Sequence, residues 1–329
     1  MPSGLARDLV FHADAVPAMG YRTFRLRPRA EPPGCADGVT TSGSVVESPF
    51  YRLELDPATG WVRSLRDRET GREWVAASAE HPFGSLLVRE PRGEPRVAEL
   101  GRIEKGRSGA LTGSVGASFS APGHPRIEVT YTLYAREKRL EVDVVLLKDP
   151  TPLLEIFVAF PFNLPGGRFR CEGPLCVTDP VCDRLPGAFA DRLTAQNWVA
   201  ATGDGQTLIW SSQDAPVVSL ARLWPGRVSP AHSAVVREDL VHPGQTGEAL
   251  TGGTIYSLLA ANNFGTNFCV SQSGTLRFRY RMTTAAGALN DADAVRRGNE
   301  WVTPFSALFT KHPRPRRLPP PPVRRAPNA

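Results

Sequence analysis

The chain has 329 residues, 41% of them hydrophobic, and a formal net charge of +6. This length can bury a sizeable core. The basic excess is carried by Lys311, Arg314, Arg316, Arg317, Arg324 and Arg325, and the remainder of the chain is formally neutral. Because a groove for nucleic acid needs basic density on the fold itself, the charge distribution excludes a nucleic-acid partner.

The sequence also indicates the cellular compartment of the protein. The first residues, MPSGLARDLVF, lack the apolar core of a signal peptide. Five cysteines are an odd number for a disulfide framework. The longest apolar run, Leu153–Phe162, is too short to span a membrane and carries Glu155. We therefore predict a reduced, soluble, cytoplasmic protein with no membrane partner.

The first elements in chain order are extended. Val16–Arg27 is predicted to be a strand. Tyr51–Leu55 alternates apolar and charged side chains, which is typical of a strand with one buried face. The segments DPATG at Asp56 and DRETG at Asp67 each combine a capping aspartate with a glycine that can take a positive φ. An antiparallel meander with strands at 61–66 and 72–75 follows from this spacing.

Further strands are predicted along the chain. Val129–Leu133 and Leu140–Leu146 alternate cleanly and indicate a hairpin. Leu153–Phe162 is nearly all apolar, which suits a strand buried on both faces. The remaining predicted strands are Ser85–Arg89, Gln206–Ser211, Val217–Ala221, Thr254–Leu259, Asn267–Gln272 and Leu276–Met282, and a hairpin turn is predicted at 203–205.

One short helix is expected near the end. Asn290 can cap a helix over Asp291–Arg297, which starts with two acids, ends with two arginines and would be stopped by Gly298. The 30 glycines and 31 prolines are dispersed along the chain, which favours many short strands. The predicted fold class is therefore all-β, a large antiparallel β sandwich with few short helices.

The histidines, cysteines and aspartates of this sequence show no pattern typical of a catalytic or metal site. His81, His124, His242 and His312 each precede proline, which marks extended or turn conformations rather than a helical ligand face. Cys171, Cys176 and Cys182 lack the spacing of a structural zinc site. Asp56 and Asp67 are explained as turn caps. We therefore predict no catalytic residue, no metal ligand and no cofactor in this chain.

The stretch Asn262–Phe268 resembles a sugar subsite. Its amides can donate to and accept from vicinal hydroxyls, and its aromatic faces can take the apolar side of a pyranose. The candidate substrate-binding residues are Asn262, Asn263, Phe264, Thr266 and Asn267. The alternative is an asparagine-rich turn whose side chains cap their own backbone. Asn197 and Trp198 raise the same question, with a packed core tryptophan favoured there.

Four motifs together resemble a known family. They are the strand and turn VRSLRDRETGRE, the segment VPAMGYRTFRL, the segment LPGAFADRLTAQNWV and the segment NNFGTNFCVSQSGTLRFRYR. In this order they resemble the β domain of the α-mannosidases of glycoside hydrolase family 38. The resemblance implies a galactose mutarotase-like supersandwich over residues 16–310, preceded by an N-terminal segment at 1–15. A proline- and arginine-rich tail at 311–329 is predicted to be disordered.

The resemblance also implies a function. In the family the zinc and the aspartate nucleophile belong to an upstream catalytic domain, and none of those motifs maps onto this sequence. Zinc is therefore expected only in that domain. The chain would be a non-catalytic β domain, inactive alone, that completes or supports an α-mannoside site with a separate catalytic chain and so serves mannose metabolism.

Two other functions remain open. The chain would be a free-standing carbohydrate-binding protein if it kept the sandwich and lost the chemistry. It would be an aldose epimerase-like enzyme if a histidine and a glutamate were positioned as a pair. The His-Pro contexts count against the epimerase, and fold analogy alone would be a poor reason to choose it.

Overall fold

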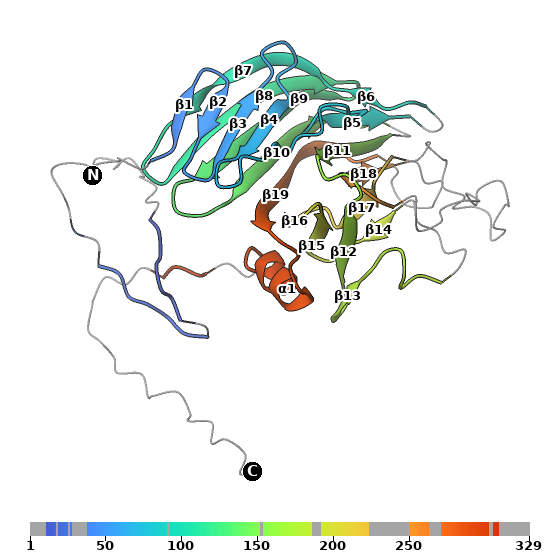
Figure 1. The fold of residues 1–329 in the computed structure, drawn as a ribbon. Helices are drawn as coiled ribbons and strands as arrows, with labels where there is room; N and C mark the ends of the chain where they lie inside the picture. Colours follow the sequence, from blue (N-terminus) through green and yellow to red (C-terminus); the bar gives the residue numbers. More distant parts are fainter. Residues whose placement is uncertain are drawn as a thin grey trace.

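The computed structural model describes residues 11–17, 19–25, 27, 38–90, 93–151, 154–185, 192–223, 250–262, 271–302 and 305–308. Within them the chain forms three antiparallel sheets of nine, six and four strands and one helix. The predicted all-β sandwich is therefore confirmed (Figure 1). The tail at 311–329 lies outside the described residues.

The largest sheet has the strand order β13-β12-β15-β16-β19-β10-β9-β8-β7. Its strands are β7 (Glu99–Arg107), β8 (Thr112–Ala121), β9 (His124–Tyr134), β10 (Leu140–Lys148), β12 (Arg168–Gly173), β13 (Cys176–Thr178), β15 (Trp198–Gly203), β16 (Gln206–Ser212) and β19 (Gly274–Ala286). The predicted hairpin is its β9–β10 pair, in which Val144 lies opposite Val129.

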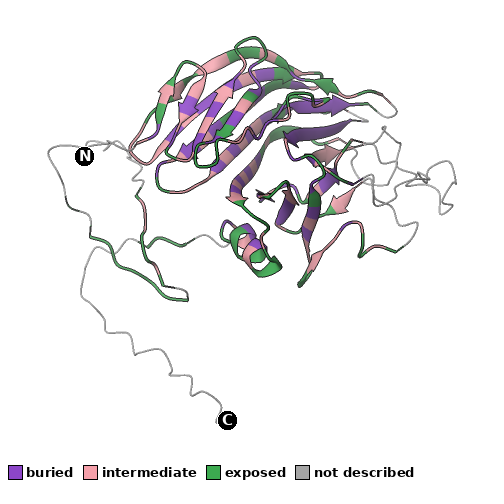
Figure 2. Ribbon diagram, in the orientation of Figure 1, coloured by how far each residue is buried: buried purple, intermediate pink, exposed green. Residues whose placement is uncertain are grey.

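Two smaller sheets complete the fold. The six-stranded sheet has the order β14-β17-β18-β11-β5-β6, with β5 (Leu86–Arg89), β6 (Arg96–Val97), β11 (Glu155–Phe162), β14 (Leu193–Thr194), β17 (Val217–Leu220) and β18 (Gly253–Ala261). The four-stranded sheet runs β1 (Thr40–Ser42), β2 (Val45–Glu47), β3 (Tyr51–Leu55) and β4 (Val62–Asp67). The predicted doubly buried strand is β11, and all eight of its residues are buried (Figure 2).

The main core joins the inner faces of all three sheets. Trp61 beside β4 stacks on Phe119 of β8 with ring centroids 3.6 Å apart. Phe160 of β11 meets the rings of Tyr280 and Trp210 on the nine-stranded sheet at 4.9 and 5.7 Å. Such aromatic contacts bury large apolar areas with a preferred geometry. The smaller sheets are thereby held against the large one.

The predicted meander forms with one difference. Asp56 and Asp67 cap their turns through side-chain bonds to the N–H groups of Ala58 and Glu69 at 2.8 and 2.9 Å. The third predicted strand, at 72–75, contributes only isolated bridges. The carboxylate of Glu73 explains this difference, because it accepts the N–H of Leu65 at 2.8 Å in place of a backbone carbonyl.

One further strand prediction is wrong, and another falls mostly outside the described residues. The strand at Val16–Arg27 is wrong for the described residues, which show no strand there. Tyr21 is 66% exposed, and without a buried face no ladder is stabilised. Most of the strand at Asn267–Gln272 lies outside the described residues. The hairpin turn at 203–205 joins β15 to β16 as predicted, with positive φ at Asp204 and Gly205.

The helix α1 (Asp291–Asn299) confirms the predicted cap and corrects the predicted stop. The Asn290 side chain accepts the N–H of Asp293 at 2.9 Å. Gly298 lies inside the helix rather than after it. A Cβ at Gly298 would stand 2.2 Å from Cγ and Cδ1 of Trp198. The glycine is therefore a close-contact residue that lets α1 pack on the outer face of β15 and β16.

This contact gives a first prediction. In a solvent-exposed helix, Gly→Ala gains roughly 1 kcal/mol. At Gly298 the new methyl group would overlap the Trp198 ring, so we expect Gly298→Ala to lower the free energy of unfolding by about 1–3 kcal/mol. Urea denaturation measures the change. The neighbouring exposed Arg297→Ala should stay within about 0.5 kcal/mol of the parent. A gain in stability for the Gly298 variant would contradict the contact.

Candidate functional site

The predicted sugar-facing stretch begins where β18 ends. Asn262 follows Ala261 directly and is half-buried. Its Oδ1 accepts the N–H of Leu154 at 2.5 Å, and its Nδ2 donates to the carbonyl of Thr151. Both ends of this amide are thus used on the backbone that leads into β11, as in the capping alternative. The other predicted residues, Asn263, Phe264, Thr266 and Asn267, lie outside the described residues.

A buried carboxylate lies beside the start of this stretch. Glu155 opens β11 and pairs in register with Ala261 on one side and with Arg89 of β5 on the other. Its Oε2 accepts Nε and Nη2 of Arg89 at 3.0 and 2.6 Å. Its Oε1 accepts Nη2 of Arg192. We call Arg89, Glu155 and Arg192 the arginine–glutamate cluster.

The members of this cluster differ in exposure. The side chains of Glu155 and Arg89 are 0% and 4% exposed, whereas that of Arg192 is 27% exposed. Burying a carboxylate costs several kcal/mol unless partners satisfy its oxygens, and here the two guanidinium groups do so. Because both oxygens already accept charged donors, Glu155 is placed to hold the two arginines.

The cluster lies on the face of the six-stranded sheet that turns away from the main core. Leu87, Phe157, Ala159 and Tyr256 form a separate buried hydrophobic group there. The Arg89 guanidinium lies over the Phe157 ring, 5.1 Å from its centroid. This stacking fixes the plane of Arg89 and hence the direction of the carboxylate that it binds.

A histidine–tyrosine pair occupies the same face. Nδ1 of His81 lies 3.1 Å from the Tyr256 hydroxyl. Burial lowers the pKa of His81 and raises that of Tyr256, so both are held neutral near pH 7. Tyr256 pairs with Ala159, four residues along β11 from Glu155 and hence about 13 Å away. His81 contacts the Tyr256 hydroxyl and Glu155 binds two arginines, so their described contacts do not pair them as an aldose epimerase would need.

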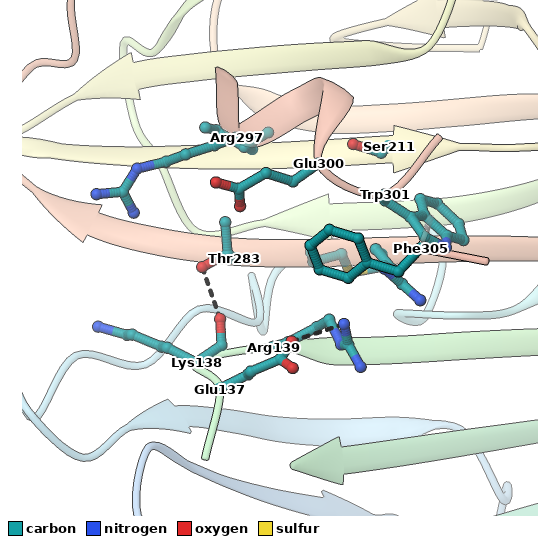
Figure 3. Close-up of a pocket in the computed structure, with 12 residues that line it drawn as sticks. Glu137, Lys138, Arg139, Ser211, Thr283, Arg297, Glu300, Trp301 and Phe305 are labelled. Atoms are coloured by element: carbon teal, nitrogen blue, oxygen red, sulfur yellow. Dashed lines mark hydrogen bonds and ion pairs between the residues drawn. The ribbon is translucent and has the colours of Figure 1, made fainter. Parts of the chain in front are cut away.

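A hollow lies between α1 and the β9–β10 turn, on the outer face of the nine-stranded sheet (Figure 3). Its volume is about 760 Å³, which lies within the range of ligand sites. Figure 3 shows Trp301 and Phe305 at one end and Lys138 and Arg297 at the other. The sequence did not reveal this hollow, because its walls come from four separate segments.

The charged groups of this hollow are largely paired. Lys138 lies 2.7 Å from both Asp67 and Glu69. The Arg281 guanidinium binds Glu141 at 2.9 Å and stacks on Trp301, 4.8 Å from the ring centroid. Lys138 thus joins the β9–β10 turn to the turn after β4, and Arg281 joins β19 to β10 and to the segment that follows α1.

Trp198 is a core residue, as the packing alternative for Asn197 and Trp198 predicted. The Trp198 ring is fully buried against α1. The Asn197 amide lies 3.4 Å from the side-chain oxygen of Asn299, at the end of the same helix. Neither side chain marks a ligand site in this structure.

The described residues hold no group of three or more His, Cys, Asp or Glu arranged to bind a metal ion. Cys171, Cys176 and Cys182 are free thiols, and burial raises the pKa of Cys171 to about 12. No helix in the described ranges is both long and apolar enough to cross a membrane.

The three antiparallel sheets, packed in two layers with one short helix, define a large β-sandwich domain. Residues 46–178 match the model of the glycosyl hydrolases family 38 C-terminal domain. That stretch runs from β2 to β13 and includes both capped turns and all of β11. The predicted resemblance to the β domain of family 38 is thereby confirmed. No curated protein sequence gives a significant match.

Two solved structures from Enterococcus faecalis share the fold. An α-mannosidase from Enterococcus faecalis V583 aligns with TM-score 0.58 and 10% identity, over 82% of this chain and 32% of its own. A glycosyl hydrolase family 38 protein from Enterococcus faecalis aligns with TM-score 0.59 and 10% identity, over 82% and 33%. A galactose mutarotase-like protein from Lactobacillus casei also aligns, with TM-score 0.40 and 11% identity, over 73% and 99%. The chain thus spans about a third of the length of the family 38 structures.

Proposed function

We propose that this chain is a non-catalytic β domain of α-mannosidase type that completes or supports a mannoside-binding site together with a separate catalytic chain. The match of residues 46–178 to the family 38 C-terminal domain carries the proposal. The arginine–glutamate cluster beside Asn262 supports it, because it brings guanidinium donors to the end of the sheet where the predicted sugar-facing stretch begins. We place the protein in the cytoplasm and in mannose metabolism, with zinc bound by the catalytic chain.

Catalysis and binding are tested separately. We expect the purified chain to show no turnover of an aryl α-mannoside, with or without added zinc, because the described residues hold no cluster of His, Cys, Asp or Glu that could bind a metal ion. The Enterococcus faecalis α-mannosidase serves as the active control. Turnover that survives chelation and is abolished by one carboxylate substitution in this chain would overturn the proposal.

Sugar binding is the positive part of the test. Because the chain would supply only part of the site, we expect weak but saturable binding of methyl α-D-mannopyranoside in ligand-observed NMR. A chain that binds no mannoside at any concentration would refute the proposed function. Mannoside binding without turnover in the presence of any catalytic chain would instead identify a free-standing carbohydrate-binding protein.

A further inference from the structure

We propose that Arg192 is the residue of this chain that donates to oxygen atoms of the bound sugar, with Glu155 as its positioning residue. The inference rests on the proposed function and names a side chain within that site. The contacts that carry it join described residues of three other segments, at the strand end where the predicted stretch at 262–267 begins.

The position of Arg192 is the first argument. It directly precedes β14, the edge strand of the six-stranded sheet, and it binds Glu155 of β11, a strand separated from β14 by β17 and β18 in the strand order. A long side chain held in one position by such a bond loses rotamer entropy, which the bond must offset. The bond to Glu155 brings the guanidinium beside the end of β18 that Asn262 follows.

The second argument is the number of donors that remain. A guanidinium carries five N–H groups in a planar fork. Arg192 commits one terminal nitrogen to Glu155, while its side chain is still 27% exposed. Arg89 already gives Glu155 two hydrogen bonds, so the bond to Arg192 is an additional one. The carboxylate thus holds a part-exposed guanidinium that, among the described residues, gives it one of its nitrogens.

The third argument concerns the ligand. A fixed fork of N–H donors matches two neighbouring acceptor oxygens, and both a vicinal diol and an oxyanion present such a pair. A sugar diol fits the setting better, because the fork is shared with a carboxylate that would repel an anion approaching the same guanidinium. The assigned ligand chemistry is therefore a pair of adjacent hydroxyl groups on an α-mannoside.

The experiment uses the full chain and methyl α-D-mannopyranoside. We expect Arg192→Gln to raise the dissociation constant roughly tenfold or more, the range for hydrogen bonds from a charged donor. The variant should fold, because Glu155 keeps both bonds from Arg89. Arg192→Lys is a second variant that keeps a charge for Glu155 but loses the fork, and it should also weaken binding.

Arg170→Gln is the matched control. Arg170 is likewise a part-exposed arginine paired with one carboxylate, that of Asp179, but it lies on β12 of the other layer. The Arg170→Gln variant should bind methyl α-D-mannopyranoside as tightly as the parent does. Thermal melting of each variant confirms that a change in binding is not a change in folding.

The outcomes distinguish a failure of the Arg192 assignment from a failure of the proposed function. If the parent binds mannoside and both Arg192 variants bind it equally well, the assignment of Arg192 is wrong and the proposed function stands. If the parent binds no mannoside, the proposed function itself fails. If the parent binds inorganic phosphate through Arg192 but no mannoside, the diol assignment is overturned in favour of an anion site.

Discussion

Replacing Glu155 with alanine is expected to destabilise the protein by about 3–5 kcal/mol, the range observed when one partner of a buried ion pair is removed. The side chain of Arg89 is 4% exposed and would lose the carboxylate that accepts two of its N–H groups. Arg192 would lose its bond as well. The change in the free energy of unfolding can be measured by urea denaturation followed by circular dichroism.

An exposed pair of similar geometry provides the control. Asp143 accepts Nε and Nη2 of Arg277, with the shortest contact at 2.5 Å, but the two side chains are 31% and 60% exposed. Solvated pairs of this kind contribute about 0–1 kcal/mol, so Asp143→Ala should cost little. Equal losses for the two alanine variants would mean that burial does not set the strength of the cluster.

Much of the fold follows from local sequence signals. Strands such as β3 and β10 can be predicted from the sequence, because every second side chain is apolar and one face of each strand is buried. The Asn290 cap and the two aspartate turns depend on hydrogen bonds between residues two or three apart, which a sequence displays directly. These elements could be predicted without any tertiary information.

Other elements depend on contacts that sequence does not display. Thr112–Ala121 reads TGSVGASFSA and carries few large apolar residues, yet it forms β8 because β7 and β9 pair with it on both sides. Gly298 resembles a helix stop until its contact with Trp198 is known. Tertiary packing overrides local propensity at both places.

The candidate site was only partly accessible from sequence. Asn262 was identified, but the bonds that commit its amide to Thr151 and Leu154 join residues more than 100 positions apart. Glu155 interrupts an apolar run and could be noticed only as an anomaly. Its partners, Arg89 and Arg192, lie 66 and 37 residues away, and only the order of strands in the sheet brings the three together.

The two aspartate turns are expected to differ greatly in their contribution to stability, although their sequences are alike. The Asp56 carboxylate caps its turn at the protein surface, so Asp56→Ala should cost about 1 kcal/mol. Asp67 is fully buried and also binds the Lys138 ammonium and the Thr284 hydroxyl, each at 2.7 Å. We expect Asp67→Ala to cost about 3–5 kcal/mol, measured by urea denaturation of both variants.

The network around Asp67 explains this expectation. The Tyr51 hydroxyl lies 2.7 Å from the Thr284 hydroxyl, which in turn donates to Asp67. The turn between β4 and residue 72 is thereby joined to β19 of the opposite layer, so loss of the carboxylate loosens two sheets rather than one turn. Equal costs for Asp56→Ala and Asp67→Ala would contradict this role.

The same network predicts a dependence on pH. Burial acts to raise the pKa of Asp67, but hydrogen bonds from Lys138, Thr284 and the N–H of Thr70 outweigh it and hold the pKa below its usual range. The stabilisation is therefore complete above the unfolded-state pKa of about 3.9 and is lost as the pH falls through the lower folded-state pKa. Asp67→Asn cannot titrate, so its deficit in the free energy of unfolding relative to the parent should shrink as the pH falls from about 5 to about 2. Urea denaturation of both proteins across this range provides the measurement, and a deficit that stays constant would show that Asp67 is not held ionised by the fold.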